Sequence, residues 1–271
     1  TMKNLLEGAP NARDLGGIKT LDGAMLSHGK LIRSGVLNAL SADDEKTLIG
    51  LRLKTVVDFR TDDERAQKPN RSIDAVSDVH CPLVEAWGKG SSRDKPEPED
   101  EEAMRTVKMA KRLMPRNPDG RAQMRSLYPI LVGTPFAMAH YKSFFSELLS
   151  ERDGALLYHC TMGKDRVGVG TALLLSALNV HRDDIFEDYL LTNERCAAGT
   201  LRLLESCRRY ADSQAELDFI YELDRVDESY LAAAFETAEE LYGSMAGYLE
   251  HAIGLYTAPA ERPRYLYPVY A

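Results

Sequence analysis

Short apolar runs alternate with polar segments along the first third of the chain. The apolar runs predict strands near Lys30–Ser34, Thr55–Arg60 and Val76–Leu83, and the segment between the first two predicts a helix over Asp43–Leu51. Strands that alternate with helices favour a parallel sheet, because a helix usually forms the crossover between parallel neighbours. We therefore expect an α/β domain with a mostly parallel central sheet flanked by helices.

The second half of the chain has a mainly helical pattern with one interruption. Ala155–Tyr158 reads as a short buried strand, and the following run to Leu178 is apolar enough to form a helix that is buried on most faces. That run is too short to span a membrane, and no other transmembrane segment is evident. The predicted helices are Pro135–Glu151, Arg166–Leu178, Arg182–Thr192, Ala197–Ala211, Glu216–Leu223, Asp227–Tyr242 and a last one near Met245–Leu255.

Residues 88–130 do not fit this alternation. They begin with a Gly- and Ser-containing stretch, continue through the acidic run Pro96–Glu102, and then carry a basic tract that reads as helical from Arg105 onward. One interpretation is a helical lid over a functional site, with a basic face that contacts an anionic membrane. The other is a solvated insertion whose acidic and basic blocks pair with each other. We expect one domain over residues 1–271, with a lid insertion at 88–130.

Composition narrows the class of protein. With 271 residues, of which 44% are hydrophobic, the chain can bury a large core, and its net charge of -8 counts against nucleic-acid binding. The four cysteines do not suggest a disulfide framework, since Cys196 and Cys207 would lie about three turns apart on a helix. No Asp/His cluster has metal-ligand spacing, so we expect neither a metal nor a cofactor.

The strongest chemical signal lies between the strand Ala155–Tyr158 and the helix after it. Amides at a helix N-terminus bind anions, and the same field favours the thiolate of a cysteine. An arginine there can hold two phosphoryl oxygens at once. These properties predict a phosphate-binding loop with Cys160 as nucleophile and Arg166 as the oxyanion clamp. The loop reads His159, Cys160, Thr161, Met162, Gly163, Lys164, Asp165, Arg166, Val167 and Gly168.

Other residues of the loop are assigned supporting roles. Gly163 and Gly168 would permit unusual backbone dihedrals and close approach of a ligand. His159 would form hydrogen bonds behind the loop, while Thr161 and Met162 complete the substrate-binding set. Lys164 either screens the negative charge of the pocket or recognises additional phosphates, and the residues leave both readings open.

The Cys-x5-Arg spacing resembles the signature loop of cysteine-based protein tyrosine phosphatases. The longer string His-Cys-x-x-Gly-Lys-Asp-Arg is similar to a bacterial branch that includes a secreted mycobacterial enzyme and dual protein and lipid phosphatases. The resemblance implies hydrolysis of phosphotyrosine, and potentially of phosphoserine or phosphothreonine, through a phosphocysteine intermediate, with phosphoinositides as alternative substrates. It extends over Asn11–Gly17, Leu31–Ser34, Val56–Thr61 with Glu64, Asp188–Asn193 and Tyr242–Leu249.

Two points depart from the pattern of such phosphatases. The residue after the arginine is commonly Thr or Ser, whereas Val167 offers no hydroxyl to the sulfur as it leaves the phosphoenzyme, which predicts slow turnover. The general acid is also ambiguous. Asp165 lies in the loop itself and is ranked first, while Glu85 follows the third predicted strand and could swing in on a mobile segment.

Charged residues at the predicted strand ends form a further group. Asp14, Asp58 and Arg60 are expected to brace the loop through buried ion pairs, and Arg33 belongs with them. Arg13 could brace the loop or contact substrate.

Two hypotheses of other classes remain open at this point. A phospho-binding module would keep the loop amides and Arg166 without turnover, and a sulfurtransferase would carry a persulfide on Cys160. The N-terminal residues show no targeting signal, which suggests a cytoplasmic location, although some relatives are exported without a visible signal peptide.

Overall fold

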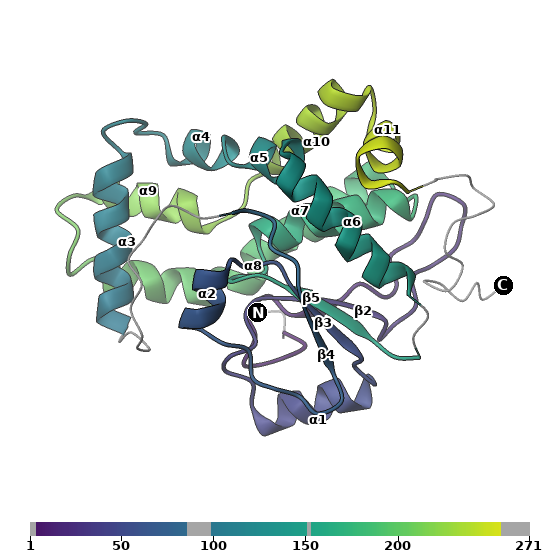
Figure 1. Cartoon of the computed structure of the whole chain (residues 1–271). Helices are drawn as coiled ribbons and strands as arrows, with labels where there is room; N and C mark the ends of the chain where they lie inside the picture. The colour runs from purple at the N-terminus through teal and green to yellow at the C-terminus, as the bar shows by residue number, and fades with distance from the viewer. Residues whose placement is uncertain (1–3, 86–98, 151–152, 256–271) are drawn as a thin grey trace.

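A five-stranded sheet forms the centre of the molecule (Figure 1). The computed structural model describes residues 4–85, 99–150 and 153–255. The edge strand β1 pairs antiparallel with β2, and all other neighbours are parallel, which confirms the mostly parallel sheet. The strands in spatial order are β1 (Arg13–Asp14), β2 (Leu31–Ser34), β5 (Leu156–His159), β3 (Thr55–Asp58) and β4 (Ser77–His80).

Alternate residues of the central strands face two separate cores. In β5, Leu156 and Tyr158 contribute to the larger core, and Leu157 contributes to the smaller one. Helices α6 (Pro135–Leu149) and α7 (Asp165–Ala177) cover the first face, while α1 (Ala42–Gly50) places Leu48 against the second (Figure 1). Period-two alternation thus buries both faces of the sheet, as the sequence predicts.

Most of the predicted helices are present with changed boundaries, whereas the helices at Asp62–Gln67 and Tyr128–Gly133 were not predicted. The segments Arg182–Thr192 and Ala197–Ala211 were expected as two helices but form one, α8 (Arg182–Cys207), because no proline interrupts the run. Both Cys196 and Cys207 lie on it as buried free thiols, and they form no disulfide, as expected. The remaining elements are α2 (Asp62–Gln67), α3 (Glu99–Leu113), α4 (Gly120–Arg125), α5 (Tyr128–Gly133), α9 (Gln214–Asp224), α10 (Glu228–Tyr242), α11 (Met245–Gly247) and the π-helix η1 (Tyr248–Ile253).

Helix α3 belongs to the irregular segment and packs against α8 and α9. Its apolar face forms a third core with those helices, in which Ala103, Val107 and Ala110 are buried. Lys111 pairs with Asp212 just before α9, at 2.7 Å. The Gly- and Ser-containing stretch and most of the acidic run lie outside the described residues. The described helix α3 packs against the C-terminal helices α8 and α9.

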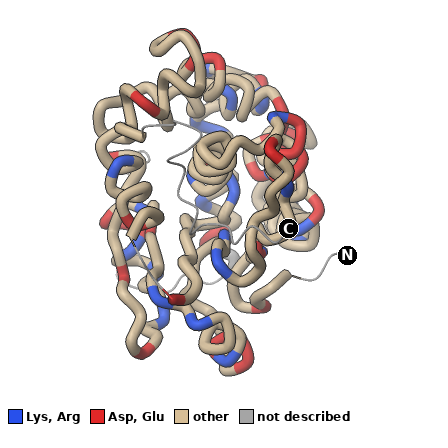
Figure 2. The backbone as a smooth tube through the Cα atoms, turned by 90° about the vertical axis from the view of Figure 1, so that its right-hand side faces the viewer, with Lys and Arg blue, Asp and Glu red and all other residues tan. Residues whose placement is uncertain are grey.

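Charged residues are spread over the molecule. In Figure 2, Lys and Arg are interspersed with Asp and Glu along the tube. In the described part of the chain, no helix combines the length and apolar character that a membrane span requires.

Candidate active site

The carboxyl ends of three parallel strands place the cysteine loop at one edge of the sheet. Ser34 of β2 and Asp58 of β3 are both in register with His159, the last residue of β5. Cys160 follows directly and is only 3% exposed, and the loop then enters α7 at Asp165. Crevices outside the carboxyl ends of parallel strands are the usual ligand sites of such sheets.

The backbone of the loop is fixed by contacts on its inner side. Gly163 has φ +67°, and a Cβ on it would lie 2.5 Å from the carbonyl carbon of Ser34, so only glycine fits. Its carbonyl accepts hydrogen bonds from Asn11 Nδ2 at 2.7 Å and Arg33 Nη2 at 3.1 Å. Because this carbonyl is turned into the protein and the first amides of α7 have no intrahelical acceptors, the loop can bind an anion through its N–H groups.

Arg166 is held from outside the loop by Glu64 of α2. Its Nη1 and Nη2 donate to the two carboxylate oxygens at 2.6 and 2.7 Å, and Nη2 also reaches Thr161 Oγ1 at 3.2 Å. The Thr161 hydroxyl donates in turn to Glu64 Oε1 at 2.7 Å. Burial would raise the pKa of Glu64, but hydrogen bonds and charge from Arg166 outweigh it and lower the pKa to about 2. Glu64 is thus an anion that orients the guanidinium.

Asp165 accepts a hydrogen bond from a buried tyrosine. Tyr128 Oη donates to Asp165 Oδ1 at 2.7 Å and is itself 2.6 Å from the hydroxyl of Tyr189. Burial raises the pKa of both tyrosines well above the ordinary range, so both stay protonated. The two hydroxyls therefore form a chain that ends on the carboxylate of Asp165.

Lys164 points toward α9 and supports the end of that helix. Its Nζ donates to the carbonyls of Leu223 at 2.7 Å and Asp224 at 3.0 Å, and lies 3.6 Å from Asp165 Oδ2. A cation at a helix C-terminus compensates unpaired carbonyls. The ammonium thus already has three oxygen partners within the protein.

The side chain of His159 lies beneath the loop in a polar cluster. Its Nε2 is 3.0 Å from Asn70 Nδ2, which can only donate, so the ring proton resides on Nδ1, 3.1 Å from the carbonyl of Cys160. Burial lowers the pKa of His159, which keeps the ring neutral at neutral pH. The ring therefore links the cysteine backbone to β3 and the segment after α2.

Asp58 and Arg60 form the charged part of the same cluster. Arg60 donates to Asp58 through Nε at 2.9 Å and through Nη2 at 2.7 Å. Burial opposes ionisation of Asp58, but the hydrogen bonds and the charge of Arg60 prevail and lower its pKa to about 2. Both side chains lie behind the loop.

Arg13 and Arg33 converge on one carboxylate, Asp188 of α8. Arg13 Nε donates to Oδ1 at 2.8 Å, and Arg33 Nη1 donates to Oδ2 at 2.5 Å. Burial and Arg33 lower the pKa of Arg13 to about 10, which still leaves it charged at neutral pH. Asp14 has different partners, since it accepts from the amides of Gly16 and Gly29 rather than from the loop.

The remaining predicted residues differ in how exposed they are and in what they contact. Glu85 is exposed and is the last residue described before the gap at 86–98. Val167 is fully buried, and a Cβ on Gly168 would lie 2.8 Å from the ring of Tyr189, so Gly168 permits close helix packing. Among the described residues, no group of three or more His, Cys, Asp and Glu side chains could hold a metal ion.

Several residues of this arrangement escaped prediction from sequence. The pairing of Glu64 with Arg166, the contact of Tyr128 with Asp165 and the position of Asn70 all join segments far apart in the chain. Thr61 and Glu64 do form a capping box, so the Thr-x-x-Glu pattern could have identified the start of α2, which was not predicted. The spacing of Thr61 and Glu64 does not indicate that Glu64 contacts Arg166 on the other side of the site.

Comparisons with known proteins agree with the geometry. The model of the tyrosine phosphatase family matches residues 5–267. A Cupriavidus necator protein, provisionally named a tyrosine-protein phosphatase, is 32% identical over 244 residues, which cover 90% of this chain and 81% of the relative. The triple specificity protein phosphatase PtpB of Mycobacterium tuberculosis is 28% identical over 292 residues, 96% of each chain. A crystal structure of P. aeruginosa TpbA with pTyr aligns at a TM-score of 0.29 and 16% identity over 74% of this chain and 89% of that one, too low a score to bear on the argument.

Proposed function

The chain belongs to the tyrosine phosphatase family, and we propose that it hydrolyses phosphotyrosine through a phosphocysteine intermediate on Cys160. The observation that carries the proposal is the placement of a buried cysteine and an oriented arginine on one loop at the start of a helix. Cys160 precedes the N-terminus of α7, and Arg166 is fixed there by Glu64. The first amides of a helix can bind a phosphate dianion, and a cysteine at this position lies where it can attack the bound phosphorus.

The reaction would proceed in two displacements. In the first, Cys160 Sγ bonds to phosphorus as the bond to the phenolic oxygen breaks, and a carboxylic acid transfers its proton to that oxygen. In the second, water attacks phosphorus, the carboxylate takes its proton, and the thiolate leaves. Loop amides and Arg166 stabilise the equatorial oxygens in both steps.

We assign the proton transfer to Asp165 rather than to Glu85. Asp165 lies inside the loop, one residue from Arg166, and Tyr128 holds its carboxylate in place at 2.7 Å. Glu85 is exposed at the edge of the described segment. A general acid must reach the leaving oxygen within hydrogen-bond distance, and a carboxylate already on the phosphate loop meets this requirement with the least movement.

Phosphotyrosine in a protein suits the site better than a phosphoinositide. Lys164 was the candidate for recognition of additional phosphates, and its ammonium donates instead to the carbonyls of Leu223 and Asp224. We therefore place phosphoinositides, and any contact with a membrane surface that they imply, second among the substrate classes. Phosphoserine and phosphothreonine are further candidates for the same loop.

The insertion is proposed to form one wall of the site within a single domain over residues 1–271. Its described part contributes α3, which packs on α8 and α9 and lines a pocket together with Thr161 and Met162 of the loop. Such a wall restricts access of water to the phosphoenzyme.

The test is metal-free hydrolysis, in EDTA, of a phosphotyrosine peptide, a phosphoserine peptide and a phosphatidylinositol phosphate. Wild type and Cys160→Ser are compared. We expect hydrolysis of the phosphotyrosine peptide to be fastest and to disappear in Cys160→Ser. Tight binding of all esters without turnover by wild type would instead support a phospho-binding module, and activity retained in Cys160→Ser would exclude the cysteine mechanism.

A further inference from the structure

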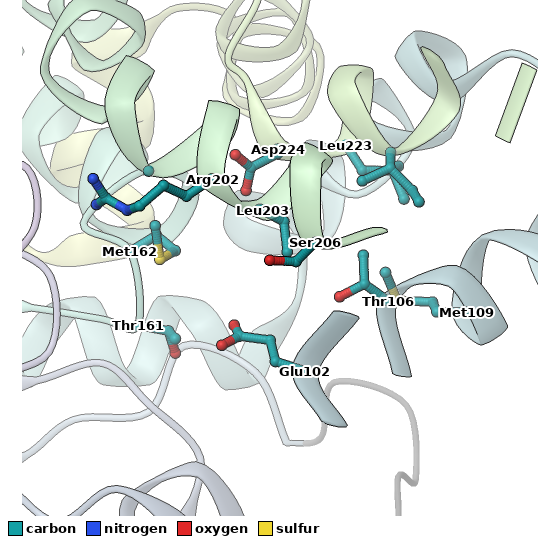
Figure 3. A pocket seen from close by; sticks show the side chains of 12 residues that line it. Glu102, Thr106, Met109, Thr161, Met162, Arg202, Leu203, Ser206, Leu223 and Asp224 are labelled. Carbon is teal, nitrogen blue, oxygen red and sulfur yellow. The ribbon is translucent and has the colours of Figure 1, made fainter. Parts of the chain in front are cut away.

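A side pocket of about 360 Å³ opens next to the cysteine loop (Figure 3). Thr161 and Met162, the two residues after Cys160, form one side of it. Helices α3, α8 and α9 supply the other walls, so the pocket lies between the insertion and the body of the protein. It is separate from the loop amides that bind phosphate, yet it begins one residue from the nucleophile.

The walls of the side pocket are largely apolar, with a few oxygen atoms placed among them. Met109, Leu203 and Leu223 provide apolar surface. In Figure 3 the carboxylates of Glu102 and Asp224 stand on opposite sides of the pocket, and the hydroxyl of Ser206 lies between them in this view. The pocket therefore offers an apolar passage with acceptor oxygens.

Negative charge predominates in the lining. Glu102 is exposed. Within the described residues, no cation forms an ion pair with its carboxylate at 4.0 Å or less. Asp224 is anchored, since its Oδ2 accepts a hydrogen bond from Thr200 at 2.6 Å. Arg202 is the cation of the lining, and its guanidinium extends toward the Met162 side in Figure 3. Two carboxylates against one guanidinium favour a cationic ligand over an anionic one.

Resting on the proposed function, we propose that the side pocket binds a long basic side chain, lysine or arginine, that flanks the phosphotyrosine of a protein substrate. Such a side chain has an apolar stem and a charged head, which match the apolar walls and the acceptor oxygens. An extended peptide advances about 3.5 Å per residue, so a residue one to three positions from the phosphotyrosine can reach a pocket that begins beside the loop. A second phosphate would face the carboxylates of Glu102 and Asp224 and would be repelled.

One glycine provides a way to close the side pocket without disturbing its walls. Gly199 of α8 lines it, and a Cβ built there meets no atom within 4 Å. A leucine at this position would occupy space that the basic side chain needs, and it also suits a helix better than glycine. Gly199→Ala is the matched control, because it changes helix propensity with little loss of volume.

The experiment compares phosphotyrosine peptides that carry Lys, norleucine or Glu at each of the three positions on either side of the phosphotyrosine. Each kcat/KM is divided by that of the same variant for p-nitrophenyl phosphate, so that effects on the loop itself cancel. Binding of the same peptides to Cys160→Ser gives a second ranking that needs no turnover. The variants are Glu102→Gln, Glu102→Lys and Gly199→Leu, with Glu101→Gln and Gly199→Ala as controls.

We expect the Lys peptide to exceed the Glu peptide by about fivefold or more at one position at least, as for a partly desolvated charge pair. Glu102→Gln should reduce that ratio, Glu102→Lys should invert it, and Gly199→Leu should abolish the preference for Lys over norleucine, while the two controls retain the wild-type ranking. Equal values for all peptides, or preference for Glu, would overturn the assignment. A wild type that binds peptides in this order but does not turn them over would refute the proposed function and keep the side pocket.

Discussion

Arg166 and Glu64 meet end to end, with both Nη–Oε distances between 2.6 and 2.7 Å, although 102 positions separate them in the chain. The carboxylate belongs to α2, the element that follows β3 in the chain. The guanidinium belongs to α7, the element that follows β5. Since β3 and β5 are hydrogen-bonded neighbours, the sheet itself determines how the arginine is aimed. The orientation of the Arg166 guanidinium therefore depends on α2 as well as on the loop.

Replacing Glu64 should weaken catalysis without removing any reacting group. Glu64→Gln removes one charged acceptor, so the guanidinium loses its fixed plane, and we expect kcat/KM to fall by about tenfold to a hundredfold. Inhibition by inorganic phosphate should weaken in parallel. Asp63→Asn, an exposed change on the same helix, is the control. Equal loss in both variants would indicate an effect of helix charge rather than of the contact with Arg166.

Proton transfer by Asp165 can be recognised from its dependence on the leaving group. Phenols with a pKa near roughly 10, such as tyrosine, need protonation far more than nitrophenol does. Asp165→Asn should therefore slow phosphotyrosine hydrolysis much more than p-nitrophenyl phosphate hydrolysis, and Tyr128→Phe should show the same pattern at smaller amplitude. If Glu85→Gln shows the pattern and Asp165→Asn does not, the assignment moves to Glu85.

Restoring a hydroxyl next to Arg166 should speed release of the sulfur. We expect Val167→Thr to raise kcat by up to about tenfold, the effect of one hydrogen bond to a charged group, and to reduce the pre-steady-state burst of nitrophenol. Val167→Ala keeps the site without a hydroxyl and should not raise kcat. A wild type without a burst would show that breakdown of the phosphoenzyme does not limit turnover.

Acid should destabilise the fold through the carboxylates behind the loop. The pKa values of Asp58 and Glu64 are lowered to about 2 from ordinary values of 3.8 and 4.5. Their contribution to the free energy of unfolding is therefore complete above about pH 5 and is lost as the pH falls toward 2. Urea unfolding at pH 6 and pH 3 measures the free energy of unfolding under the two conditions. The difference between wild type and Asp58→Asn should shrink at the lower pH, and a constant difference would contradict the shift.

Local sequence signals predicted the parts of the site that lie within one continuous segment. The loop from His159 to Gly168 combines a strand, a glycine turn and a helix start, and each of these has its own pattern. The continuous helix α8 was predicted as two helices, Arg182–Thr192 and Ala197–Ala211. The burial of Cys196 and Thr200, which the sequence alone does not show, favours a helix that continues through residues 193–196. Contacts such as that of Tyr128 with Asp165 depend on tertiary packing, which a single sequence does not encode locally.

The same reasoning explains the charged residues at strand ends. Arg33 and Asp58 were expected to brace the loop, and Arg13 either to brace it or to contact substrate. All three form buried ion pairs. The prediction could not identify Asp188 as the shared partner of the two arginines, because it lies on α8, more than 150 positions further along the chain. The topology of the fold, rather than composition, determines which charged residues form ion pairs.

The hydrogen bonds of Asn11 affect which truncated fragments of this protein can keep the shape of the cysteine loop. Its Nδ2 donates to the carbonyl of Gly163 and to the hydroxyl of Thr192 on α8. The loop therefore depends on a residue near the start of the chain and on a helix that follows the loop in sequence. A fragment that begins after residue 11 retains the cysteine and the arginine, but the carbonyl of Gly163 keeps only one of its two side-chain donors, Arg33. Dephosphorylating activity should therefore be a property of the assembled whole, emerging last in refolding and lost first when the N-terminal segment is removed.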